Sequence, residues 1–143
     1  MKAAVSALAA SALDMFREPA ALKELTVEAD VAEGVTLQAN RQQMGQLLSI
    51  LLDNAVKYCP QGGALRLSLR REDRAVLRLR NTGEDTVDTD RIFDRFYRAD
   101  SARSQKSGGC GIGLSAAEAI VRLHKGEISA VCENGEIEFT VRI

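Results

Sequence analysis

Apolar residues recur at intervals of three and four in three stretches of the chain. The clearest stretch lies between residues 41 and 58, where the repeat comprises Met44, Leu47, Leu48, Leu51, Leu52, Ala55 and Val56. This spacing predicts an amphipathic helix with one broad buried face. Weaker repeats of the same kind predict a helix over residues 1–16, ended by Pro19, and another over residues 111–124.

Alternation of apolar and polar residues marks the predicted strands. Two alternating rows, separated by a polar turn at residues 71–74, consist of Leu65, Leu67, Leu69, Leu77 and Leu79. The last strand alternates in the same way after Asn134-Gly135, a dipeptide typical of tight hairpins. Shorter strands are predicted at residues 25–29 and 35–38. Together these elements predict an α+β fold, a two-layer sandwich with about three helices packed on one face of a mixed, mainly antiparallel sheet.

The overall composition argues against several classes of function. The 143 residues include 19 basic and 20 acidic side chains, and the net charge of -1 gives no reason to expect a nucleic acid or an anionic membrane surface as partner. Three cysteines without metal-ligand spacing favour reduced thiols in a cytosolic compartment. The length suits one domain, and no apolar run approaches the roughly 20 residues that span a bilayer.

One polar residue continues a row of apolar ones. Asn81 falls on the same face of its predicted strand as Leu77 and Leu79, the face that is expected to turn inward. A buried amide needs a hydrogen-bonding partner. That partner can be a protein group, a water molecule or a ligand.

Two polar residues lie beside the apolar stripe of the helix predicted over residues 41–58. Asn54 and Lys57 are three positions apart and therefore share a face. An amide oxygen is a suitable ligand for Mg²⁺, and a lysine can neutralise phosphate oxygens. The alternative is a solvated polar edge, which most amphipathic helices have, and spacing alone favours that alternative.

A glycine-rich turn, GGCGIG at residues 108–113, opens the last predicted helix. Free backbone N–H groups and the positive end of the helix dipole suit such a turn to phosphate. Its spacing differs from that of the dinucleotide-binding fingerprint, and the chain has no GxxxxGK[ST] loop. The basic segment before it, residues 98–109, is either a lid that closes over a nucleotide or a solvated loop.

Four segments in order make a more specific signal than any one of them alone. They read LLDNAVKY, NTG, IFDRFYRADSARS and GGCGIGLSAAEAIVRLHKGEI. This series closely resembles the N, G1, F and G2 boxes in the catalytic, ATP-binding domain of sensor histidine kinases, which belong to the GHKL superfamily with gyrase and Hsp90-type ATPases. The resemblance extends from the region of Leu25 to the C-terminus.

The resemblance implies ATP and Mg²⁺ as cofactors and a catalytic set of Asn54, Lys57 and Arg98. Asn54 would hold the Mg²⁺ between the phosphates. Lys57 and Tyr58 would lie along the phosphates and the ribose, and Arg98 would approach the γ-phosphate.

The same resemblance implies the contacts to the base and the lid. Asn81 would accept a hydrogen bond from the adenine amine, and Gly83 would let the backbone pass close to the base. Phe93, Phe96 and Tyr97 would anchor the lid. Gly109, Gly111 and Gly113 would wrap the phosphates, and Leu114 would belong to the same cofactor-binding set.

Three positions depart from the family's pattern, and one of them, Ile50, stands in the helical turn before Asn54 where the family often has a polar Asn. Asn81 stands where the family usually has Asp, and a neutral amide forms a weaker hydrogen bond than a carboxylate. Asp85 stands where another glycine is usual, which adds a negative charge and removes backbone freedom. Because of these departures, a second function stays possible: a degenerate interaction module that binds nucleotide weakly. A small serine kinase of the anti-sigma-factor type is a further alternative, against which the segment FDRFYRAD argues.

His124 is the only histidine in the chain and matches the family's HGG-like segment, where it is expected to end a helix. The resemblance therefore implies that the γ-phosphoryl group passes to a histidine on a separate dimerisation domain, and that a response regulator is a further partner. Nothing in residues 1–143 resembles that dimerisation domain or a sensor domain. We expect a cytoplasmic domain of a membrane-associated parent, monomeric when isolated.

Overall fold

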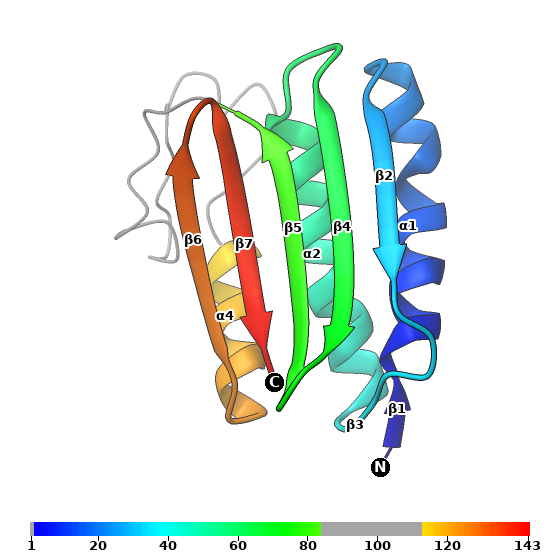
Figure 1. Ribbon diagram of the computed structural model, residues 1–143, viewed down its shortest axis with the longest axis vertical. Helices are drawn as coiled ribbons and strands as arrows, with labels where there is room; N and C mark the ends of the chain where they lie inside the picture. Colours follow the sequence, from blue (N-terminus) through cyan, green and yellow to red (C-terminus); the bar gives the residue numbers. More distant parts are fainter. Residues whose placement is uncertain (1, 84–112) are drawn as a thin grey trace.

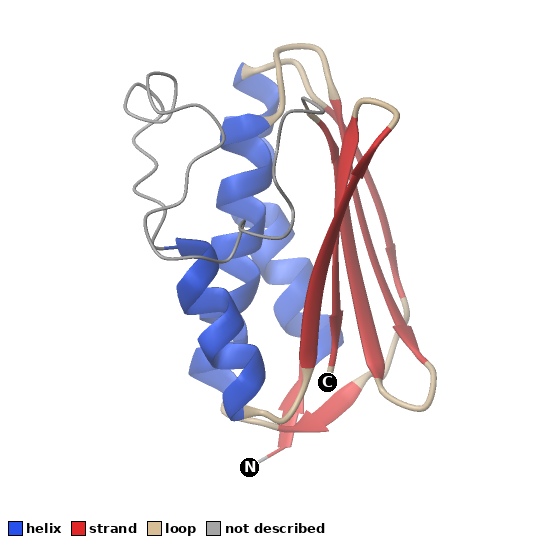
Figure 2. Ribbon diagram, turned by 90° about the vertical axis from the view of Figure 1, so that its left-hand side faces the viewer, coloured by secondary structure: helices blue, strands red, loops and turns tan. Residues whose placement is uncertain are grey.

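The computed structural model describes residues 2–83 and 113–143, which form a sheet with helices on one of its faces (Figures 1 and 2). In chain order the elements are β1 (Lys2–Ala4), α1 (Val5–Leu22), β2 (Thr26–Val31), β3 (Thr36–Gln38), α2 (Arg41–Tyr58), β4 (Ala64–Arg71), β5 (Ala75–Thr82), α4 (Gly113–Leu123), β6 (Glu127–Glu133) and β7 (Glu136–Arg142). The predicted two-layer α+β sandwich is confirmed.

The main sheet has five strands in the order β2-β4-β5-β7-β6. β2 runs parallel to β4, and the other neighbouring pairs are antiparallel. The sheet is therefore mixed and mainly antiparallel, as predicted. β1 and β3 form a separate antiparallel pair below the helices.

The two faces of the sheet differ as the alternation predicts. The inward row comprises Leu65, Leu67, Leu69, Leu77 and Leu79, all buried against the helices. The outward face is charged. Arg66 on β4 forms an ion pair with Glu28 on the neighbouring strand β2, with 2.7 Å between Nη2 and Oε2. Because such pairs are solvent-exposed, they add little to stability, and the buried leucines carry the packing.

α2 forms over the range that its apolar repeat predicts. The seven apolar residues of the repeat are buried, and the side chain of Asn40 caps the helix by accepting a hydrogen bond from the Gln43 N–H at 3.0 Å. α2 lies between α1 and α4 and contacts both, so it is the central helix of the layer. None of the helices within residues 2–83 and 113–143 has the length and hydropathy of a membrane span.

The prediction for the first helix is wrong at both ends. Its first residues form β1, and the helix continues through Pro19 to Leu22. A proline inside a helix removes the hydrogen bond to the carbonyl four residues earlier, here that of Met15. Met15 is 70% exposed, so water can take the place of the missing donor.

α1 and α4 end in the same backbone motif. At the end of α1 the Leu25 N–H donates to the Ala20 carbonyl and the Glu24 N–H donates to the Ala21 carbonyl, both at 3.0 Å. This is the Schellman pattern, which requires a left-handed residue after the helix. Glu24 (φ 57°) and, after α4, Lys125 (φ 59°) occupy that position, although neither is glycine.

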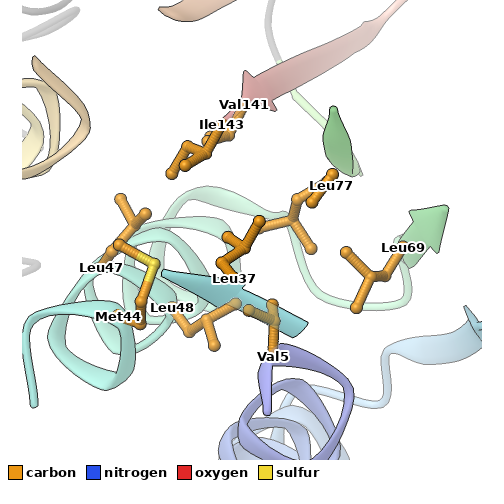
Figure 3. Close-up of a pocket in the computed structure, with 10 residues that line it drawn as sticks. Val5, Leu37, Met44, Leu47, Leu48, Leu69, Leu77, Val141 and Ile143 are labelled. Carbon is orange, nitrogen blue, oxygen red and sulfur yellow. The ribbon is translucent and has the colours of Figure 1, made fainter. Parts of the chain in front are cut away.

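A small apolar cavity lies at the end of the domain where β5 begins (Figure 3). Its volume is about 20 Å³, and its lining consists of Val5, Leu37, Met44, Leu47, Leu48, Leu69, Ala75, Leu77, Val141 and Ile143. A cavity without polar partners does not hold a water molecule stably. It is therefore a packing defect in the core, not a ligand site.

Candidate functional site

The site predicted from the sequence is built at the opposite end of the domain, where β5 and α2 both end (Figure 1). Gly63 lies between the two: a Cβ added there would be 2.6 Å from Cys59 Sγ, just after α2, and 3.1 Å from Thr82 Cβ, at the end of β5. The structure thus brings the last turns of α2 next to the end of the strand that carries Asn81.

Asn81 is the one buried polar residue among the described residues, with 1% of its surface exposed. It is in register with Leu65 and Ile137, whose side chains are also buried, which confirms its predicted place in the inward row. Its Nδ2 donates to the Thr82 carbonyl at 2.7 Å. Its Oδ1 is buried and has no hydrogen-bonding partner in the described part of the chain.

An unpaired buried acceptor costs about 1–3 kcal/mol, so such atoms are uncommon without a role. The bond to Thr82 also fixes the amide's orientation, because turning the group over would set Oδ1 against another carbonyl oxygen. Asn81 therefore presents an acceptor, and this end of the domain can receive an N–H donor from a ligand.

Gly83 follows directly on β5. Its N–H donates to the Gly135 carbonyl at 2.9 Å. A Cβ added at Gly83 would lie 3.6 Å from Asn81 Nδ2 and 3.6 Å from Ile137, which are ordinary contact distances. Packing within the described residues does not itself require a glycine there, so the expectation of a close approach to a base stays a prediction.

The last two turns of α2 carry the remaining predicted polar residues. Asn54 is half-buried. Lys57 Nζ pairs with Asp53 Oδ2 at 3.0 Å, and Tyr58 is 37% exposed. The ammonium of Lys57 already has a carboxylate partner, but both side chains are open enough to solvent for Lys57 to contact an anion as well.

Asn54 offers a metal ion one amide oxygen, and the described residues add no acidic or thiol cluster to it. Residues 2–83 and 113–143 contain no cluster of three or more His, Cys, Asp or Glu side chains that could hold a metal. Mg²⁺ typically keeps several waters and binds through one or two protein oxygens together with phosphate oxygens. A single amide oxygen near a phosphate chain fits that coordination.

α4 begins at Gly113, and Leu114 is packed in the core with 8% of its surface exposed. The Leu114 side chain therefore serves the packing of α4 on α2. Several predicted site residues lie outside the described residues: Phe93, Phe96, Tyr97, Arg98, Gly109 and Gly111.

Comparison with known proteins agrees with this geometry. Residues 39–143 match the family described as histidine kinase-, DNA gyrase B- and HSP90-like ATPase. The chain belongs to this ATPase family. Its domain is of the type found in the catalytic part of sensor histidine kinases.

Sequence relatives are sensor proteins several times longer than this ATPase domain. The chain is 39% identical over 124 residues to the probable sensor protein PcoS of Escherichia coli, covering 85% of this chain and 26% of PcoS. It is 32% identical over 132 residues to the signal transduction histidine-protein kinase BaeS of Escherichia coli (strain K12), covering 90% of this chain and 28% of BaeS. The chain thus spans about a quarter of the length of these relatives.

Solved structures confirm the fold. The catalytic domain of histidine kinase ThkA superposes with a TM-score of 0.86 at 18% identity, covering 100% of this chain and 93% of that chain. Full-length ShkA in complex with AMPPNP gives a TM-score of 0.80 at 23% identity, covering 96% of this chain and 29% of that chain. At these identities the similarity is one of fold.

His124 lies at the other end of the ATPase domain. Its Nδ1 is 2.8 Å from the Ile120 carbonyl, and its Nε2 accepts from the Asn40 N–H at 3.2 Å. The ring thus joins the end of α4 to the start of α2, which confirms the predicted helix-ending role. Both ring nitrogens are engaged in structural contacts.

Two contributors to the site were missed from the sequence. The Thr82 carbonyl orients Asn81, and Lys23 binds the last turn of α2 through hydrogen bonds to Val56 and Lys57. A backbone carbonyl leaves no trace in sequence. A lysine after a helix is too common to attract notice.

Cys59 also lies at this end, and burial raises the pKa of its thiol although the charge of Lys23 acts in the opposite direction. The thiol is therefore a neutral packing group.

Proposed function

We propose that this ATPase domain binds Mg²⁺–ATP between the end of α2 and Asn81, and transfers the γ-phosphoryl group to a histidine on a separate dimerisation domain of a longer protein. The Oδ1 of Asn81, which is buried and has no partner among the described residues, carries the proposal, because a ligand N–H would remove its desolvation cost. Membership of the histidine kinase-like ATPase family supports it.

The base contact follows from the fixed orientation of Asn81. With Nδ2 bound to the Thr82 carbonyl, Oδ1 accepts from the exocyclic amine of adenine. A purine with an oxygen in place of the amine would set two acceptors against each other, so the site favours ATP over GTP. A neutral hydrogen bond of this kind contributes about 1 kcal/mol, less than a carboxylate would.

The phosphates are assigned to the end of α2. Asn54 supplies an amide oxygen for Mg²⁺, which when bound would neutralise charge on the phosphates. Lys57, with Tyr58 beside it, lies along the phosphate and ribose side, and the family resemblance assigns Arg98, which is outside the described residues, to the γ-phosphate. Together these residues orient the γ-phosphoryl group, and positioning and charge neutralisation are the main sources of rate in this chemistry.

In the transfer step, a nitrogen of the acceptor imidazole forms a bond to the γ-phosphorus while the bond to the β–γ bridging oxygen breaks and ADP leaves. The acceptor must come from another domain, because His124 is held at the far end of the molecule by two hydrogen bonds. The proposed partners are therefore a phosphoacceptor domain and a response regulator, with this domain in the cytoplasm and monomeric by itself.

Calorimetric titration with ATP and ADP, with and without Mg²⁺, tests the proposal. Mg²⁺-sensitive binding is expected, and Asn54→Ala should weaken ATP binding about tenfold or more without unfolding the protein. Gln46→Ala, at an exposed amide on the same helix, is the matched control and should change nothing. Equal affinities for the two variants would contradict the assignment of Asn54.

A degenerate interaction module is the second candidate, and the neutral amide at position 81 favours it. The same titration separates the two. A folded protein that releases no heat with either nucleotide would exclude the kinase and leave the module.

A further inference from the structure

The side chain of Lys23 reaches from the end of α1 to the last turn of α2. Its Nζ donates to the Val56 carbonyl at 2.8 Å and to the Lys57 carbonyl at 3.0 Å. These contacts join residues more than 30 positions apart along the chain. They occur on the helix that carries the proposed phosphate-binding side chains.

The two carbonyls need an external donor. The last four carbonyls of an α-helix have no partner inside the helix. In α2 the Ala55 carbonyl accepts from the Cys59 N–H at 3.0 Å, whereas those of Val56 and Lys57 accept from Lys23. The ammonium also complements the negative end of the helix dipole.

Lys23 is itself held in place. It stands at the end of α1, just before the left-handed Glu24 of the Schellman motif, so its backbone direction is set by that motif. Its carbonyl accepts from the Gly62 N–H at 2.9 Å. One residue therefore binds both the last turn of α2, through its side chain, and the turn that follows, through its backbone.

We propose that Lys23 is a positioning residue for the nucleotide site, which fixes the last turn of α2 so that Lys57 and Tyr58 stay on the phosphate and ribose side. The inference rests on the proposed function. Lys23 acts from the α1 side of α2 through backbone carbonyls, and its role is to hold the turn rather than to touch the ligand. Removing the ammonium should loosen the phosphate side and leave the base contact of Asn81 intact.

The test compares ATP with adenosine, which lacks the phosphates. Lys23→Met keeps the length of the side chain and removes the ammonium. Calorimetry should show ATP binding about tenfold weaker, as for a lost charge-assisted hydrogen bond, and adenosine binding unchanged. Amide hydrogen exchange in residues 56–62 should accelerate, while exchange in β5 stays the same.

Two control variants separate positioning from stability. Lys23→Arg keeps a charged donor and should restore much of the ATP affinity. Leu77→Val removes a methylene from the core beside the apolar cavity, far from the α2 end, and should lower stability while sparing both ligands. If Leu77→Val lost as much ATP affinity as Lys23→Met, the effect of Lys23 would be one on overall stability, and the positioning role would be refuted.

The remaining outcomes are distinct as well. Unchanged ATP affinity in Lys23→Met would overturn the positioning role while leaving the proposed function intact. If the unaltered protein bound neither ATP nor adenosine, the proposed function would fail first, and the positioning role with it.

Discussion

At position 81, the residue that would suit ligand binding differs from the residue that would give the most stable fold. Its Oδ1 is buried without a partner in the described part of the chain, at a position where Leu77 and Leu79 continue the row with apolar groups. A fold selected only for stability would place an apolar residue there too. Retention of an amide at this position is therefore best explained by the ligand it receives.

Asn81→Leu tests this conflict at the scale of one residue. The variant loses the bond to Thr82 but also removes the unpaired acceptor, so the free energy of unfolding of the nucleotide-free protein should rise by about 1 kcal/mol. ATP binding should disappear. Urea denaturation and calorimetry measure the two effects, and a variant that is both less stable and still able to bind would refute the explanation.

Among the elements, the ends of α1 and α4 are strained in the same way. Each Schellman motif places a non-glycine residue at positive φ, Glu24 in one case and Lys125 in the other. L-residues pay about 1 kcal/mol in this conformation. After α4 the motif brings the backbone of Gly126 close to that of Arg142, so that a Cβ added at Gly126 would be 2.5 Å from the Arg142 carbonyl oxygen.

Lys125→Gly should therefore stabilise the protein by about 0.5–1 kcal/mol, since glycine adopts positive φ without a steric penalty. Lys125→Ala removes the same side chain and keeps the Cβ, so it should bring no such gain. Thermal unfolding of the two variants gives the comparison. Equal stability of the glycine and alanine variants would show that the backbone at position 125 is not under strain.

At the scale of the whole molecule, the two ends of the domain differ in what they contain. One end holds the nucleotide site that we propose, and the other contains the apolar cavity beside Val5 and Leu77 (Figure 3). The cavity is lined by the first residue of α1, by β3, by the first turns of α2 and by residues of β4, β5 and β7, so both layers and the small accessory sheet meet there. Stability can therefore be changed at this end without altering the site.

Val5→Ile adds one methylene to the cavity lining and should raise the free energy of unfolding by about 0.5–1 kcal/mol. The same substitution at Val121, which is fully buried in α4 and outside the cavity lining, should lower the free energy of unfolding because an added methylene has to displace packed neighbours. Denaturant unfolding of both variants provides the test. ATP affinity should remain that of the unaltered protein in Val5→Ile.

Local pattern in the sequence determined most of the elements. The repeat from Met44 to Val56 sets the face of α2, and the alternation around Leu67 and Leu79 sets the inward face of the central strands, because each is a property of one element's own period. The same alternation placed Asn81 on the buried face. The motifs beside it gave the family, which the comparisons confirm.

Only the tertiary structure decided how the parts of the site are held. The reach of Lys23 to the end of α2 and the bridge from His124 to Asn40 join groups that are far apart along the chain, and no local period encodes such contacts. The continuation of α1 through Pro19 also depended on surroundings, because Met15, whose carbonyl loses its helical partner, is an exposed residue. Periodicity fixes which face of an element is buried, whereas hydrogen bonds between elements exist only once packing has brought their ends together.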